Sequence, residues 1–309
     1  MPGRINRRAF VRGSLAGASL ALGAGAAAAG QAPAPAGKPL LPTGKIGKLE
    51  ITRLILGGNL LGRYTHARDL SFVLKLIREY NTDEKILQTL AAAEANGINT
   101  VSVHVGRDTR RLLKEHREKR GGKLHWILYA TSNIEDWAVY SRDVQQMADD
   151  GAEAIYVWGV HCDALVAKGK LDVIAKAVEL IKANGVPAGV CAHDLRVVQE
   201  CEKAKLPVDF YVKTFHHLNY PSAKMDYDSV WCRNPKETAE FMAGVEKPWI
   251  AYKVMAAGAI PPKDAFRYAY EGGADFIFAG MFDFEIAEDV RLARDILAAE
   301  PKRVRPWRA

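Results

Sequence analysis

From residue 50 onward, the chain alternates short apolar runs with longer amphipathic segments, eight times in succession. Short runs rich in β-branched and aromatic residues, separated by helical patterns, are typical of βα units that build a parallel sheet. The expected strands are residues 51–58, 98–105, 123–131, 153–160, 187–193, 209–215, 248–255 and 274–281. Eight units over about 260 residues match the usual length of a (β/α)8, or TIM, barrel. An open doubly wound sheet is the alternative, but no GxGxxG turn follows the first strand.

The segments between these runs have helical periodicity, and glycines mark several of their ends. The expected helices are residues 82–96, 109–120, 141–150, 164–184, 195–205, 236–245, 262–272 and 285–298. Gly97, Gly121 and Gly185 follow three of them, which is the usual place for glycine beyond a helix C-terminus. We therefore predict an α/β chain with a single TIM-barrel domain over residues 46–300 and a basic C-terminal tail over residues 301–309.

The first thirty residues have the composition of an export signal. Arg7 and Arg8 precede Phe10, and an Ala/Gly-rich apolar stretch follows without any acidic residue. This order is similar to the twin-arginine export signal. The apolar stretch is barely long enough to span a membrane, and a Pro/Ala-rich linker over residues 31–45 follows the signal peptide of residues 1–30. We expect the twin-arginine translocase as a partner during export, a periplasmic or otherwise exported protein, and no stable membrane span after processing.

The overall charge argues against nucleic acid as a partner. The formal net charge is +7, and four arginines of the first thirty residues supply 4 of it, which leaves 7 − 4 = +3 for the rest. That excess is too small and too scattered for a nucleic-acid-binding surface. The four cysteines show no CxxC spacing and no dense disulfide pattern.

Polar side chains recur where the expected strands end. Five of the eight histidines lie there, namely His104, His161, His193, His216 and His217. In a TIM barrel the strand ends and the loops that follow them carry the chemistry. A single histidine at such a place is more often structural, so the prediction of an active site depends on their convergence.

Two lysines also stand in these runs. Lys213 interrupts an apolar strand that leads into His216 and His217, and Lys253 ends the seventh strand. A lone ammonium is costly to bury, so each lysine must be solvated, paired or placed in a polar site. The candidate catalytic residues are therefore Lys213, Lys253, His161 and His104. Either lysine could act as a base, as an oxyanion partner, or as a nucleophile that forms a Schiff base when its pKa is lowered by the other cation.

A divalent metal is an alternative basis for the chemistry. Imidazole and carboxylate groups on adjacent strand ends suit such an ion. The candidate ligands are His193, His216, His217 and Asp194, although no HxH or HExxH spacing is present.

The long segment after the sixth strand, residues 218–235, combines Tyr220, Tyr227 and Trp231 with asparagine, aspartate and arginine. Rings beside polar groups suit a lid over a polar ligand such as a sugar. A loop whose rings only cover the barrel mouth is an equal alternative.

Four segments resemble the aldo/keto reductase family. Gly47–Asn59 is similar to the entry into the first barrel strand, and Ala92–Asn99 resembles the approach to the second. Tyr252–Gly258 and Ala279–Glu288 are similar to the seventh strand and to the glycine-led segment that binds the phosphate of a nicotinamide cofactor. The resemblance implies a TIM barrel and an oxidoreductase that uses a nicotinamide nucleotide. It also implies that Asn59, Gly280 and Asp283 bind this cofactor.

The catalytic positions depart from the family pattern. The family has Asp and Tyr after the second strand, Lys at the end of the third and His at the end of the fourth. Here only His161 stands at a matching position. The acidic stretch over residues 283–288 also disfavours a phosphate.

Three functions therefore remain open. The first is an exported, divergent aldo/keto reductase-like oxidoreductase that acts on a carbohydrate-like or other polar carbonyl compound. The second is a divalent-metal-dependent lyase, isomerase or epimerase that acts on a sugar, and the third is a solute-binding barrel without catalysis.

Overall fold

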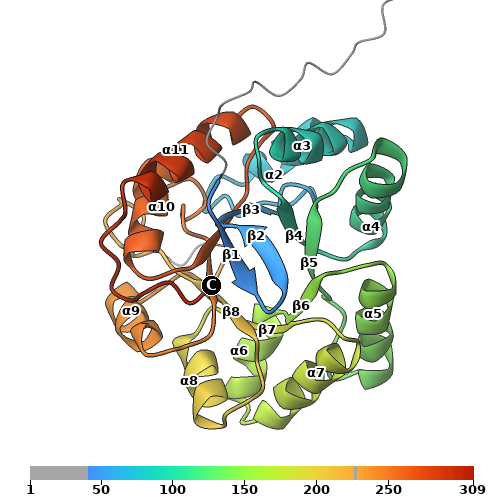
Figure 1. The fold of residues 1–309 in the computed structure, drawn as a ribbon, viewed down its shortest axis with the longest axis vertical. Coiled ribbons are helices and arrows are strands. Elements are labelled where there is room, and N and C mark those ends of the chain that lie inside the picture. Colours follow the sequence, from blue (N-terminus) through green and yellow to red (C-terminus); the bar gives the residue numbers. More distant parts are fainter. Residues whose placement is uncertain (1–40, 226–227) are drawn as a thin grey trace, which may run out of the picture. The chain divides into compact units, whose positions relative to one another are not determined.

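The computed structural model describes residues 41–225 and 228–309, and its centre is a closed barrel of eight parallel strands (Figure 1). Around the barrel the strands follow the order β10-β3-β4-β5-β6-β7-β8-β9. Their bounds are β3 (Leu54–Gly57), β4 (Thr100–His104), β5 (His125–Tyr129), β6 (Ala154–Val157), β7 (Ala188–Ala192), β8 (Phe210–Thr214), β9 (Trp249–Tyr252) and β10 (Phe276–Ala279). Each lies inside its predicted range, so the predicted TIM barrel is confirmed.

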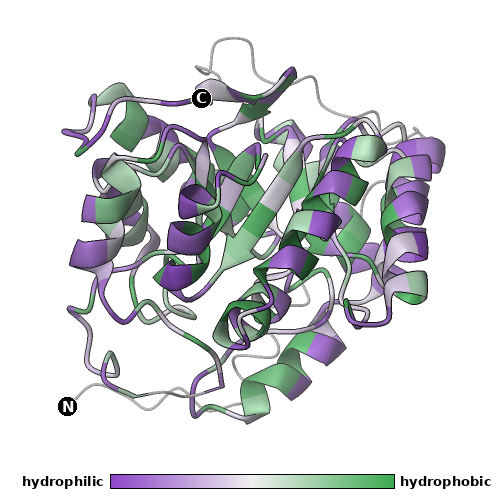
Figure 2. Ribbon diagram, turned by 90° about the horizontal axis from the view of Figure 1, so that it is seen from below, coloured by the Kyte–Doolittle hydropathy of each residue, from purple (hydrophilic) through white to green (hydrophobic). Residues whose placement is uncertain are grey.

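Helices surround the barrel, with their hydrophilic faces turned outward in Figure 2. They are α2 (Phe72–Tyr80), α3 (Asp83–Ala95), α4 (Arg107–Lys114) with the short π-helical turn η1 (Glu115–Lys119), α5 (Trp137–Asp149), α6 (Gly159–Ala167), α7 (Leu171–Ala183), α8 (Leu195–Lys203), α9 (Pro235–Ala243), α10 (Pro262–Glu271) and α11 (Ile286–Ala298). The helix predicted over residues 164–184 is two helices, because Gly169 adopts a left-handed φ of 71° that ends α6. Helix α2 was not predicted, since its Phe72 and Leu76 are exposed and only Ile77 is buried.

A β-hairpin precedes the barrel and closes its N-terminal end. It consists of β1 (Thr43–Ile46) and β2 (Leu49–Thr52), joined at Gly47 with a φ of 61°. Residues 51–52 of the predicted first strand therefore belong to β2, and the predicted linker ends inside β1. Ile46 and Ile51 are fully buried in one apolar cluster with Phe276 and other residues of the barrel interior. Each buried isoleucine stabilises this closure by about 1.5–3 kcal/mol.

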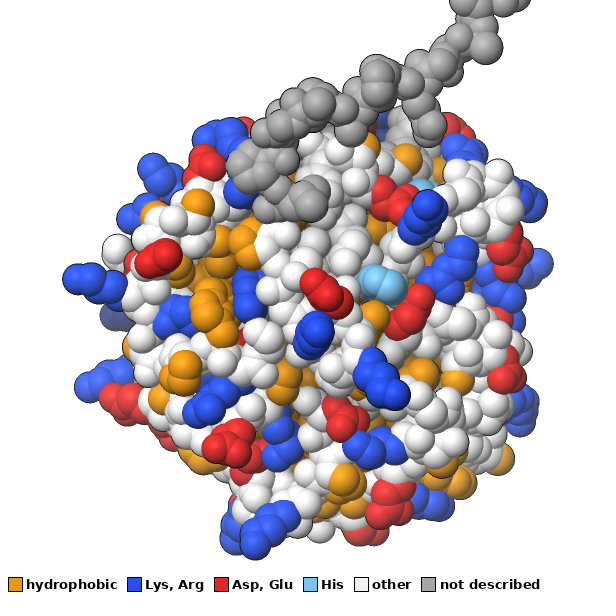
Figure 3. All heavy atoms as spheres, in the orientation of Figure 1, with side chains coloured by type: hydrophobic (Ala, Val, Ile, Leu, Met, Phe, Trp, Pro, Cys, Tyr) orange, Lys and Arg blue, Asp and Glu red, His pale blue; other side chains and the backbone are white. Residues whose placement is uncertain are grey.

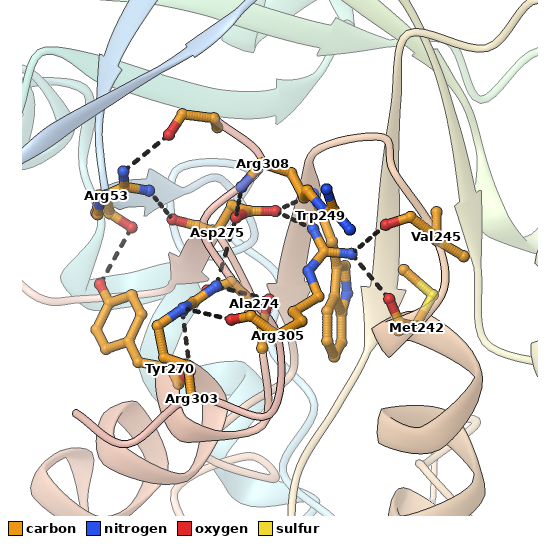
Figure 4. Close-up of polar contacts among 12 residues, drawn as sticks. Arg53, Met242, Val245, Trp249, Tyr270, Ala274, Asp275, Arg303, Arg305 and Arg308 are labelled. Carbon is orange, nitrogen blue, oxygen red and sulfur yellow. Dashed lines mark hydrogen bonds and ion pairs between the residues drawn. The ribbon is translucent and has the colours of Figure 1, made fainter.

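Asp275 binds the segment after α11 to the same end of the barrel (Figure 4). This carboxylate is fully buried, pairs with Arg305 and lies 3.4 Å from Arg303. It also accepts hydrogen bonds from the backbone N–H groups of Trp249 and Arg308, at 3.0 and 2.9 Å. The predicted basic tail is thus part of the packed structure, and two of its arginine side chains lie inside it.

Lysine and arginine side chains alternate with acidic ones over the face drawn in Figure 3. In the described part of the chain, no helix is long and apolar enough to cross a membrane. The predicted signal peptide and most of the predicted linker lie outside the described residues.

Candidate active site

A cavity of about 1160 Å³ opens at the C-terminal end of the barrel. Seven of the eight strands place residues around it: Gly57 and Asn59 after β3, Ser102 and His104 on β4, Tyr129 and Thr131 at β5, Tyr156 and Trp158 at β6, Cys191 and His193 at β7, Tyr252 and Lys253 at β9, and Phe278 and Gly280 at β10. This is the end where TIM-barrel enzymes carry their active sites.

His193 lines the cavity and forms a histidine–carboxylate pair with Asp163. Nδ1 of His193 lies 2.7 Å from Oδ2 of Asp163, which projects from α6. Oδ1 of Asp163 also accepts the backbone N–H groups of His193 and Asp194, at 3.1 and 3.0 Å. Burial lowers the pKa of His193, and the hydrogen bond to Asp163 opposes that shift. The neutral ring therefore donates through Nδ1 and keeps the lone pair of Nε2 available, which is the arrangement of a general base.

Lys253 lines the same cavity. Its Nζ donates to Oγ of Ser229 and, at 3.2 Å, to the carbonyl oxygen of Val230. Within residues 41–225 and 228–309 it forms no ion pair with a carboxylate. Burial is the main cause that lowers the pKa of Lys253 to about 8. A substantial fraction of the side chain is therefore uncharged slightly above neutral pH.

Aromatic rings form much of the wall. Tyr129 stacks on Tyr156, with ring centroids 4.8 Å apart, and on Trp158 at 6.4 Å. The hydroxyl of Tyr156 lies 3.3 Å from Oγ of Ser102. Flat rings with a few hydroxyl groups suit a ligand that has both apolar faces and polar edges, such as a sugar.

The loop predicted as a lid does contribute to the cavity, through Asp228, Ser229, Val230 and Trp231. Asp228 accepts the backbone N–H groups of Ala67 and Arg68, at 2.6 and 3.1 Å, which ties this loop to the loop after β3. Oγ of Ser229 lies 3.2 Å from Nε2 of His66 in that same loop.

The four predicted catalytic residues separate into two groups. His104 and Lys253 line the cavity. His161 is not among the described residues that line it, and its ring packs against Trp158. Lys213 is 1 % exposed and also lies outside that lining. Its Nζ donates to the carbonyl oxygen of His193 at 2.8 Å and to Thr214, so it positions the end of β7.

The predicted metal ligands do not converge. Both ring nitrogens of His216 are used, because Nδ1 donates to the carbonyl oxygen of His217 and Nε2 accepts the N–H of Cys232, each at 3.0 Å. Nδ1 of His217 accepts the N–H of Asn219, and Asp194 caps α8. Across the described ranges, no three His, Cys, Asp or Glu side chains are grouped so that they could hold a metal ion.

Only two of the three predicted cofactor-binding residues are among the described residues that line the cavity. Asn59 and Gly280 line the cavity, but Asp283 accepts the Tyr80 hydroxyl at 2.6 Å and the Lys85 ammonium at 3.0 Å. Near the start of α11, the cavity wall carries two acidic side chains, Glu285 and Asp289. Asp289 is 4 % exposed, and burial, reinforced by Glu285 and Glu288, raises its pKa to about 7. These carboxylates repel a phosphate, so the residues at this position do not fit the phosphates of a nicotinamide nucleotide.

Sequence reasoning missed Asp163 and His66 as site residues. Asp163 directly follows His161 and Cys162 at a strand end, which is the signal that could have found it. Its pairing with His193 joins residues 30 positions apart and is visible only in the folded barrel. No sequence signal distinguishes His66 from an ordinary loop histidine.

Solved structures of other proteins have a fold similar to that of this chain. No family model and no curated protein matches the chain. A solved structure of a putative aldo-keto reductase from Pseudomonas aeruginosa is similar, with a TM-score of 0.59 and 19 % identity over 83 % of this chain and 94 % of that one. The structure of a glycerol dehydrogenase from Gluconobacter oxydans is also similar, with a TM-score of 0.52 and 12 % identity over 84 % of this chain and 96 % of that one. The aldolase called DAHP synthase from Thermotoga maritima also has a TM-score of 0.52, with 10 % identity over 86 % and 75 %.

The chain thus has a (β/α)8 barrel fold like that of the aldo/keto reductases, and the resemblance seen in the sequence is confirmed at the level of the fold. Its polar groups differ from that family's catalytic set. The cavity instead presents a carboxylate-oriented histidine and a lysine.

Proposed function

We propose that this protein is an exported TIM-barrel enzyme that moves protons on a small polar carbonyl compound, such as the open-chain form of a sugar. The observation that carries the proposal is His193, which lines the cavity and is hydrogen-bonded to Asp163. A neutral imidazole held by a carboxylate can remove a proton next to a carbonyl group and return it elsewhere.

Lys253 supplies the second element of this chemistry. Among the described residues that line the cavity, it is the one lysine or arginine. When protonated, it stabilises the negative oxygen that develops as a proton leaves the neighbouring carbon. The stacked rings of Tyr129 and Tyr156 provide a flat surface against which a short carbon chain can lie.

The test is solvent hydrogen exchange. The processed protein is incubated in D2O with glyceraldehyde, dihydroxyacetone and common pentoses and hexoses, and loss of the C–H signal beside the carbonyl is followed by proton NMR. We expect exchange of at least one compound, reduced at least about hundredfold in His193→Gln. The matched control is His125→Gln, at the start of β5 and the opposite end of the barrel, which should exchange normally. No exchange with any compound, or equal exchange in His193→Gln, would refute the proposal.

Carbonyl reduction is the second candidate, favoured by the fold shared with aldo/keto reductases. Titration of NADH and NADPH against the protein, followed by nucleotide fluorescence, separates the two. Because Glu285 and Asp289 oppose phosphate, we expect no binding up to millimolar nucleotide. Saturable binding of NADH or NADPH would favour the reductase. If the protein binds sugars but neither exchanges their hydrogen with solvent nor reduces them, it is a solute-binding barrel.

Export rests on the sequence of residues 1–30, and we propose the twin-arginine translocase as the partner in it. Replacing both Arg7 and Arg8 by lysine should retain the protein inside the cell. Cell fractionation followed by immunoblotting measures this, and unchanged export would exclude that route.

A further inference from the structure

We propose that Lys253 is a nucleophile that forms an imine with the carbonyl carbon of the substrate. This inference rests on the proposed function, since it requires a carbonyl compound in the same cavity. It adds a covalent step and restricts the substrate to an aldehyde or ketone whose carbonyl group is free.

The first support is the surroundings of the amine. Lys253 lies in the cavity wall, and its Nζ has hydroxyl and carbonyl acceptors, Ser229 and Val230, rather than a carboxylate partner within the described residues. Burial without such a partner favours the uncharged amine, which is the form that attacks a carbonyl group.

The backbone gives a second, independent support. Lys253 has a φ of 58°, and Ala256 and Ala257 have φ values of 48° and 59°. These are left-handed conformations that residues other than glycine adopt at a cost. Strain of this kind persists where the surrounding structure enforces it and is concentrated at active sites. Here it holds a lysine at the cavity, immediately after β9.

The contrast with Lys213 shows which lysine is available. Lys213 is also buried, but its Nζ is engaged with His193 and Thr214, and it lies outside the described lining of the cavity. Its charge nevertheless contributes to lowering the pKa of Lys253. Lys213 thus positions the end of β7, whereas Lys253 is the lysine that reacts.

The reaction balances with groups at hand. The neutral amine of Lys253 adds its electron pair to the carbonyl carbon, and the C=O π pair moves to oxygen. A proton passes from nitrogen to this oxygen, with Nε2 of His193 as the carrier, to give a carbinolamine. One further proton, taken from solvent through His193, leaves with the hydroxyl group as water, and the nitrogen lone pair forms the protonated imine. The sum is amine plus carbonyl plus one proton, giving iminium ion and water, without any oxidant or reductant.

The experiment is reductive trapping. The processed protein is incubated with dihydroxyacetone or glyceraldehyde and sodium cyanoborohydride, and the adduct is measured by intact mass and located by peptide mapping. We expect one reduced adduct per chain, on Lys253, formed faster than on any other lysine. It should be lost in Lys253→Met and also in Lys253→Arg, which keeps the charge but cannot form the imine. Lys236→Met, whose side chain is 86 % exposed on α9, is the matched control and should be labelled like the unaltered protein.

The outcomes distinguish this inference from the proposed function. If Lys253 is not labelled, or is labelled no faster than exposed lysines, while deuterium exchange still depends on His193, the imine is wrong and the proton-transfer proposal stands. If both exchange and labelling are absent, both proposals fail. Peptide mapping of the unaltered protein decides the point even if a variant does not fold.

Discussion

Nδ1 of His193 donates to the carboxylate of Asp163 across 2.7 Å, and this contact leaves Nε2 as the ring nitrogen without a proton. We predict that Asp163→Asn reduces solvent exchange about 10²–10⁴-fold, because an amide can also donate to Nδ1 and favour the other tautomer. Asp194→Asn is the matched control, since asparagine still caps α8. Comparable losses in the two variants would show that Asp163 acts only through folding.

The pH dependence of trapping follows from the pKa of Lys253, which burial lowers to about 8. Attack needs the free amine, so trapping should become faster as pH rises. The free fraction grows from about one tenth at pH 7 to about nine tenths at pH 9 and then levels off. Initial rates of adduct formation between pH 6 and 10 measure this. A rate that keeps climbing beyond pH 10 would indicate a lysine with an ordinary pKa.

Replacement of Asp275 by asparagine should destabilise the fold by about 3–5 kcal/mol, because the buried guanidinium groups of Arg303 and Arg305 lose their counter-charge. Urea denaturation followed by tryptophan fluorescence measures the loss. Asp149→Asn, on the exposed end of α5, should stay within about 0.5 kcal/mol of the unaltered protein. A small effect at Asp275 would mean that the network is dispensable.

Asp289→Asn should stabilise the protein at pH 8 and have little effect near pH 4. Burial raises the pKa of Asp289 to about 7, so the folded state holds this proton more tightly than the unfolded chain does. The penalty for the charged form therefore grows as pH rises from about 4 to about 7. Denaturation midpoints at both pH values test this. Asp264→Asn, exposed in the first turn of α10, is the control without such a trend.

The barrel could be predicted because every strand is a short apolar run flanked by amphipathic helices, and this local pattern admits few architectures. The β1–β2 hairpin and α2 were missed for local reasons. Thr52 and Leu54 belong to different strands separated by a single residue, and α2 exposes the apolar side chains that normally signal a buried face.

The site was predicted in outline only. A strand end places a residue at the barrel mouth, but it does not say whether the side chain faces the cavity or the surrounding shell. His193 and His216 illustrate this, since one lines the cavity and the other holds Cys232 in the loop beside it. The direction of each side chain depends on contacts with residues far away in the sequence, and no sequence motif indicates these contacts.

The Asp275 network also limits when the protein can mature. The carboxylate lies immediately before β10, and its partner Arg305 is synthesised 30 residues later. Until Arg303 and Arg305 have emerged, the buried carboxylate lacks both guanidinium groups with which it forms ion pairs. The closing strand should therefore settle only near the end of translation.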